Sequence, residues 1–149
     1  MLLTGEGPGT AVHAGAFIRK GEIVLDAALL AKPKEAGRIL IHELYHFVWT
    51  RLSNAVRRSY EALVVDEIRS GATGELGWSS EWRKNALAAR DVRARSKRWR
   101  EYLCESFCDT AAWLSAGGSR HEEFTLPSIP RKRRRAWFRQ TGELGRISL

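Results

Sequence analysis

One stretch of sequence decides the fold of this chain: Ile39-Leu40-Ile41-His42-Glu43-Leu44-Tyr45-His46-Phe47-Val48. Apolar side chains recur in it at steps of three and four residues, which predicts an amphipathic helix. Pro33 suits the first turn of that helix, and the pattern continues to about Arg51. Because His42 and His46 are four residues apart, the helix places both on one face, one turn apart.

The spacing His42-Glu43-x-x-His46 is typical of a metal-binding helix. Two imidazoles one turn apart can both reach one Zn²⁺ ion with bonds of about 2.0–2.1 Å. Glu43 is rotated by about 100° from His42, so its carboxylate borders the ligand face without binding the ion. The sequence therefore predicts one catalytic zinc, with Glu43 as the general base. The alternative is a pair of core histidines satisfied by ordinary hydrogen bonds.

A catalytic zinc usually has three protein ligands and one open position. The residues that can supply the third ligand are His13, His121, Cys104, Cys108, Glu101, Glu105 and Asp109. Glu105 is the best candidate because it lies one helical turn before Asp109. One of these carboxylates can bind the ion, while the other accepts the N–H of a ligand histidine and fixes its tautomer.

The pattern His42-Glu43-x-x-His46 followed by Glu105-x-x-x-Asp109 resembles the gluzincins, the thermolysin-like metallopeptidases, over roughly residues 16–116. The small size is similar to that of the minigluzincins, their single-domain members. The resemblance implies that His42, His46 and Glu105 bind zinc, that Glu43 is the base and that Asp109 orients a histidine. It also implies an edge strand, an active-site helix and a glutamate helix. Some minigluzincins carry a terminal segment that blocks the site as a zymogen.

A peptidase also needs an oxyanion donor and a surface that holds the substrate. His121, Tyr102 and Tyr60 are candidates for the donor, and an ordinary structural role is the alternative for each. The apolar segment Ile23, Val24 and Leu25 is a candidate edge strand that pairs with an extended peptide. A simple core strand is the alternative for this segment.

The remaining pattern predicts a minimal, mostly helical α+β domain over residues 1–123. Residues 11–19 and 22–26 are expected to form a β-hairpin or small antiparallel sheet, with its turn at Gly21. Further helices are expected at residues 55–69 and from about 81 to 114, with a glycine loop between them. Apart from a short helix near residues 136–140, residues 124–149 are expected to form an extended basic tail, because Pro127 and Pro130 disfavour helix before them. This tail either covers the active site or is mobile.

The chain has a formal net charge of +8, concentrated in two stretches. Residues 90–100 hold one, and the other is the block Arg131, Lys132, Arg133, Arg134 and Arg135. Such a block can bind an anionic partner, or it can be a solvated surface. One alternative function is therefore a nucleic-acid-associated protein that uses Trp99 and Trp137 for stacking. A catalytically silent zincin scaffold that acts as a binding module is another.

The two cysteines, Cys104 and Cys108, favour a reducing compartment. On a helix their Cβ atoms lie about 5–6 Å apart, whereas a disulfide needs roughly 3.5–4.5 Å. Reduced thiols are expected, which is typical of a cytoplasmic protein. The sequence has no apolar run long enough to predict a membrane span, and its first ten residues do not have the pattern of a secretory signal peptide.

Overall fold

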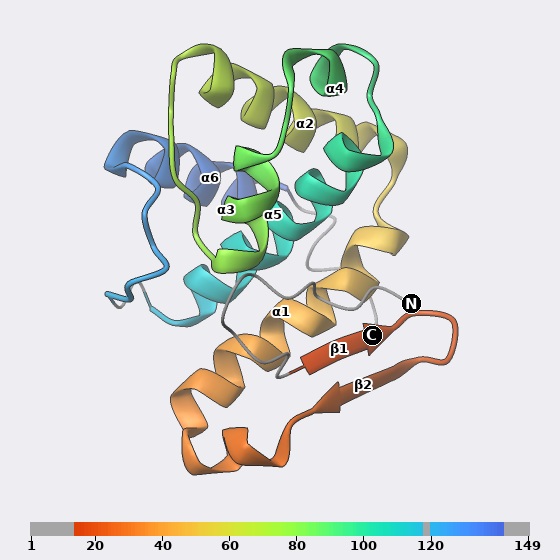
Figure 1. The fold of residues 1–149 in the computed structure, drawn as a ribbon, viewed down its shortest axis with the longest axis vertical. Helices are drawn as coiled ribbons and strands as arrows, with labels where there is room; N and C mark the ends of the chain where they lie inside the picture. The colour runs from red at the N-terminus through yellow and green to blue at the C-terminus, as the bar shows by residue number, and fades with distance from the viewer. Residues whose placement is uncertain (1–13, 118–119, 142–149) are drawn as a thin grey trace.

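The computed structural model describes residues 14–117 and 120–141, and these residues form a mostly helical domain with one two-stranded antiparallel sheet (Figure 1). The predicted α+β class is confirmed. His13 and the first part of the predicted strand at residues 11–19 lie outside the described residues, as do residues 142–149 of the predicted tail. Within the described part of the chain, no helix combines the length and apolar character needed to cross a bilayer.

The predicted hairpin is present as β1 (Ala14–Phe17) and β2 (Glu22–Leu25). The two strands pair with Ala14 opposite Leu25 and Phe17 opposite Glu22. Gly21 closes the turn with φ of 68°, a left-handed conformation that glycine adopts without steric cost. A short 3₁₀ helix, η1 (Ala27–Ala31), then leads into the first α-helix.

The two helices that carry the predicted ligands lie side by side in the middle of the molecule (Figure 1). The first, α1 (Pro33–Arg51), has the predicted bounds, and its buried side chains include His42, Glu43 and His46. The second, α5 (Lys97–Ser115), is the most buried helix and carries Glu105 and Asp109. A helix α2 (Asn54–Arg69) joins them in the core, starting one residue before its predicted position.

The single long helix predicted from about residue 81 to 114 is wrong. The segment forms α3 (Trp78–Asn85), α4 (Ala89–Arg93) and α5. Asp91 is the physical reason, because its carboxylate accepts hydrogen bonds from the backbone N–H of Ala88 and from the hydroxyl of Ser96. Ser96 in turn caps α5. The breaks let α3 fold back against α5, where it contacts the predicted ligands.

The tail was expected to be extended apart from a short helix near residues 136–140, but a single helix, α6 (Ser128–Gln140), covers residues 128–140. Pro127 is the N-cap and Pro130 lies in the first turn, where a missing N–H costs nothing. Helix α6 lies along α2. The sheet contains only β1 and β2 within the described residues, so residues 124–130 do not pair with Ile23–Leu25. The proposed cover over the active site is therefore not formed by this segment.

Arg134 explains why α6 belongs to the core. Its side chain is 0% exposed and forms ion pairs of 2.7 Å with both Glu67 and Glu75. Tyr102 also donates its hydroxyl to Glu75. Three other residues of the basic block also have partners within the chain. Arg131 donates to backbone carbonyls, Arg135 stacks over Trp113, and the exposed Arg133 pairs with Asp66 on the surface.

Replacing Arg134 with methionine is expected to destabilise the fold by about 3–5 kcal/mol, because it leaves two buried carboxylates without their cation. Lys132→Met is the matched control, since Lys132 is exposed on the same helix. We expect it to change stability by less than about 0.5 kcal/mol. Urea unfolding followed by circular dichroism measures both. Equal midpoints for the two variants would show that α6 does not stabilise the domain.

Candidate metal centre

Three buried donors from α1 and α5 converge on one point. The Nε2 atoms of His42 and His46 are 3.3 Å apart. Glu105 places Oε2 at 3.2 Å from Nε2 of His42 and Oε1 at 3.7 Å from Nε2 of His46. Tetrahedral zinc with bonds of about 2.0–2.1 Å requires donors about 3.3 Å apart. The three side chains therefore fit a zinc ion in their spacing and in their chemistry.

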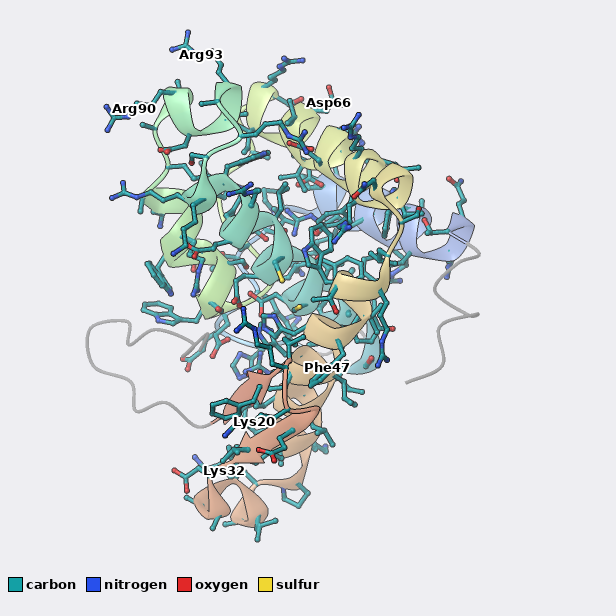
Figure 2. The ribbon with its side chains drawn as sticks, turned by 90° about the vertical axis from the view of Figure 1, so that its right-hand side faces the viewer. Lys20, Lys32, Phe47, Asp66, Arg90 and Arg93 are labelled. Carbon is teal, nitrogen blue, oxygen red and sulfur yellow. The ribbon has the colours of Figure 1, made fainter. Side chains whose placement is uncertain are left out.

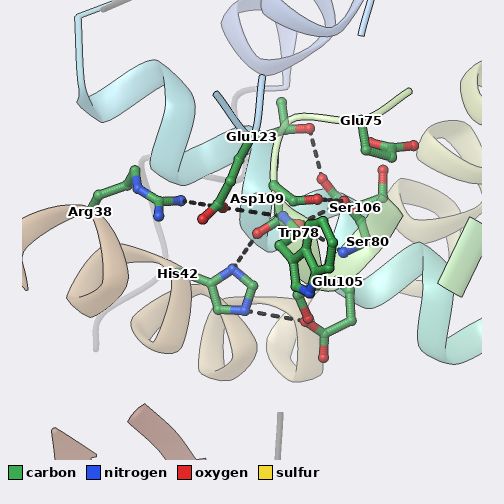
Figure 3. A network of polar contacts seen from close by, with 12 residues as sticks. Arg38, His42, Glu75, Trp78, Ser80, Glu105, Ser106, Asp109 and Glu123 are labelled. Atoms are coloured by element: carbon green, nitrogen blue, oxygen red, sulfur yellow. Dashed lines mark hydrogen bonds and ion pairs between the residues drawn. The ribbon is translucent and has the colours of Figure 1, made fainter. Parts of the chain in front are cut away.

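The hydrogen bonds behind the imidazoles set their tautomers. Nδ1 of His42 lies 2.7 Å from Oδ1 of Asp109, which can only accept when ionised, so Nδ1 carries the proton (Figure 3). Nδ1 of His46 lies 3.4 Å from Sγ of Cys104. With N–H at each Nδ1, both Nε2 atoms present lone pairs to the same point. Two lone pairs and a carboxylate in one buried place favour a cation there.

The same arrangement shifts the pKa values of the donors when a proton is the only cation available. Burial lowers the pKa of His42, but the charge of Asp109 and the hydrogen bond to it outweigh this effect and raise it well above its ordinary value. Burial raises the pKa of Glu105, but hydrogen bonding to His42 and the charges of both histidines bring it down to about 2. Glu105 is therefore an anionic ligand at neutral pH.

Helix α3 supports the centre from the opposite side, and the sequence pattern did not predict this contact. Ser80 donates its backbone N–H and its hydroxyl to Oδ2 of Asp109, at 3.0 and 2.6 Å. Ser79 donates to Oε2 of Glu105 at 2.5 Å. A Cβ atom at Gly77 would overlap the carboxylate of Asp109, so glycine permits the close approach. The small side chains at 77, 79 and 80 are the only feature of the sequence that relates to this contact.

Glu43 lies beside the donors and has an unused oxygen. The residue is 2% exposed, and its Oε2 is buried without a hydrogen-bond partner among the described residues. Burial raises the pKa of Glu43, and the nearby charges of His42 and His46 partly oppose that rise. A buried carboxylate oxygen that bonds to nothing is costly unless a ligand or water uses it. This is the position expected for a general base.

Several predicted site residues lie elsewhere. Tyr102 is committed to Glu75, and Tyr60 bonds to Ser106 and Thr110, so neither hydroxyl serves the centre. His121 lies 3.5 Å from Glu35 and contacts Phe124. Glu35, His121 and Glu123 form a second, half-exposed group of residues that could bind a metal ion. Arg38 already supplies a cation to the carboxylates of Glu35 and Glu123.

The structure also places the predicted substrate strand, Trp99 and the basic stretch at residues 90–100. Ile23, Val24 and Leu25 lie in β2, and Val24 is 54% exposed. In both Figures 1 and 2, β1 lies nearer than β2 to α3 and α5. Trp99 is fully buried, so it is not available to stack on a base. Figure 2 shows Arg90 and Arg93, from the basic stretch at residues 90–100, pointing outward at the end of the molecule opposite the sheet.

Comparison with known proteins gave no match: no family model, no curated protein and no solved structure is significantly similar to this chain. The class of site is thus defined by its own residues, as a buried His-His-Glu centre with a carboxylate behind one histidine.

Asp109→Asn is expected to lower zinc affinity by about 10–100-fold, because an amide neither fixes the tautomer of His42 nor raises its basicity as a carboxylate does. Asp66→Asn, on the surface of α2, is the matched control and should leave zinc affinity unchanged. Competition with a chromophoric chelator measures both values. Equal affinities in the two variants would remove Asp109 from any role in orienting His42.

Proposed function

We propose that this protein is a zinc-dependent peptide-bond hydrolase of the gluzincin type. The observation that carries the proposal is the convergence of Nε2 of His42, Nε2 of His46 and the carboxylate of Glu105, with the free oxygen of Glu43 beside them. Three ligands of these types with an adjacent unpaired carboxylate are typical of a catalytic zinc centre and not of a structural one. Structural zinc sites more often use four ligands rich in cysteine.

When bound, zinc supplies a Lewis acid that polarises a carbonyl group and brings the pKa of water to about 7. Glu43 accepts the proton of the attacking water and delivers it to the leaving amine. The raised pKa of Glu43, caused first by burial, suits this exchange, because its protonated form is more accessible than that of an exposed glutamate. Asp109 and Ser80 keep His42 in the tautomer that the centre requires.

Arg83 replaces Tyr102 and His121 as our candidate for the oxyanion donor. Its Nη2 lies 3.8 Å from Oε1 of Glu105, and its side chain is 11% exposed. Hydrogen bonds to Ser79 and stacking over Trp82 hold the guanidinium in place. A fixed cation next to the reacting carbonyl stabilises the charge that develops on its oxygen.

The surface around the centre supports an extended, apolar substrate. Trp78 follows Gly77, which touches Asp109, and it precedes Ser79, which bonds Glu105. Trp78 is 43% exposed and Trp82, one turn later on α3, is 36% exposed. We propose that a peptide pairs with the edge of the sheet and places an apolar side chain against these two rings. The edge of β1 lies nearer to α3 than the Ile23–Leu25 segment of β2 does.

The alternative functions have weaker support. A catalytically silent scaffold gives no reason for a buried glutamate with an unused oxygen at position 43. A nucleic-acid-binding role loses Trp99 and Arg134, which are both fully buried. Within the basic block, Lys132 is exposed and Arg131, Arg133 and Arg135 have partners inside the chain.

Cleavage of a peptide library by the zinc-loaded full chain tests the proposal. We expect peptide products, a preference for an aromatic or large aliphatic residue near the cut, and complete inhibition by a zinc chelator that added zinc reverses. Mass spectrometry identifies the products and the cut sites. Cleavage that persists in the chelator would assign the activity to another mechanism or to a contaminant, and no cleavage of any peptide by zinc-loaded protein would contradict the proposal.

A further inference from the structure

The imidazole of His46 has a second group of donors on its other edge. Its Nε2 faces His42 and Glu105, whereas its Nδ1 lies 3.4 Å from Sγ of Cys104. Cys108 follows one turn later on α5, and a ring nitrogen of His46 and both sulfurs lie within 4.8 Å of one another. Both cysteines have free thiols. Neither thiol takes part in the proposed hydrolysis.

We propose that Nδ1 of His46 and the thiolates of Cys104 and Cys108 form a second cation site, specific for a soft, thiophilic metal ion. The spacing supports this assignment. Bonds of about 2.3 Å to sulfur and about 2.0 Å to nitrogen put tetrahedral donors roughly 3.5 Å apart, close to the 3.4 Å between Nδ1 and Sγ of Cys104. Two sulfurs and one imidazole prefer Cu(I) or Cd²⁺ over the harder ions that carboxylates select.

Two of the three donor residues are buried and the third is partly exposed. Cys108 is 0% exposed and His46 is 3% exposed, so their donor atoms are fixed by the packing of α1 against α5. Cys104 is half-buried, which leaves a path from the solvent to the sulfurs. Binding displaces the remaining thiol protons and the Nδ1 proton of His46, so this imidazole becomes an imidazolate whose Nε2 and Nδ1 each face one cation site.

The shared imidazole distinguishes this site from an ordinary thiol pair. In the metal-free molecule Nδ1 of His46 shares a hydrogen bond with Cys104, on the ring edge where His42 has Asp109. If hydrogen bonding to His46 were the only role of Cys104, one sulfur would suffice. Cys108 lies in the core, and its sulfur belongs with Cys104 and His46 to one group of possible metal ligands whose donor atoms lie within 4.8 Å of one another.

Titration of the full-length, zinc-loaded chain with Cd²⁺, under argon and with a reductant that does not bind metals, tests the site. Thiolate ligands give Cd²⁺ an ultraviolet charge-transfer band that carboxylates and imidazoles do not give. We expect this band to saturate at about one Cd²⁺ per chain. Cys104→Ala and Cys108→Ala should each remove most of it, whereas Glu105→Gln, which alters only the first centre, should retain it.

The partly exposed Cys104 keeps the test informative if the buried Cys108 variant does not fold, and circular dichroism checks both proteins. Absence of the band in the wild type, or an unchanged band in Cys104→Ala, would overturn the proposal. The readout is spectroscopic and needs no enzymatic activity. A chain that shows the band but cleaves no peptide would therefore contradict the proposed function while it supports the thiolate site.

Discussion

Glu43→Gln is expected to lower peptide turnover by about 10²–10⁴-fold, the range that a general acid–base group contributes, while the protein keeps its zinc. The amide has the shape of the carboxylate but does not accept the proton of the attacking water. Glu43 is also the residue whose Oε2 is buried without a partner, so the substitution breaks no hydrogen bond at that atom. The expected result is therefore a folded, metal-loaded and inactive protein.

Turnover of the best peptide from the library, together with zinc per chain, measures this prediction. Glu122→Gln is the matched control, because Glu122 is an exposed glutamate outside the centre, and it should retain full activity. Wild-type turnover in Glu43→Gln with zinc still bound would remove Glu43 from the role of base. Loss of zinc in that variant would instead place Glu43 among the ligands.

Glu105→Ala is expected to reduce zinc affinity by more than the about 10–100-fold that changes behind a ligand typically cause. It removes the carboxylate that lies 3.2 Å from His42 and 3.7 Å from His46. It also leaves the two imidazoles as the remaining ligands of the centre. Zinc held by two nitrogens alone is exchanged easily, so the purified variant should lose its metal on dialysis.

Two variants of the same helix control this result. Glu101 lies one turn before Glu105, is half-buried and pairs with the exposed Lys97, so Glu101→Ala should keep its zinc. Cys108→Ala tests the rival ligand set and should also keep it. Zinc lost from Cys108→Ala but retained by Glu105→Ala would show that the ion belongs to His46 and the thiols, and the gluzincin-type centre would then be wrong.

Local patterns were sufficient to predict the hairpin and α1, the helix that carries His42 and His46. The three- and four-residue apolar steps from Ile39 to Val48 predicted α1, and β-branched residues around Gly21 predicted the hairpin. The spacing of His42 and His46 was enough to propose one centre, because residues four apart on a helix share a face. Glu105 was selected from its spacing to Asp109 and from the resemblance to the gluzincins.

Most of the parts that sequence reasoning missed depend on contacts between distant residues. Asp91 is an exception, because its carboxylate accepts from Ala88, three residues earlier, and from Ser96, five residues later, and so helps to begin α4 and α5. The basic block was predicted to be exposed because isolated arginines are rarely buried. Arg134 is buried because Glu67 and Glu75 lie opposite it. Ser79 and Ser80 reach the centre only because the chain breaks before α5.

Zinc per chain is the most direct measure of the central claim. The full-length protein, expressed in zinc-replete medium and freed of loosely bound metal by gel filtration, is analysed by inductively coupled plasma mass spectrometry beside His42→Ala and His46→Ala. The account predicts about one zinc per wild-type chain and almost none in either variant, because each variant loses one of three ligands. A folded wild-type protein without zinc, or equal zinc in all three proteins, would contradict it.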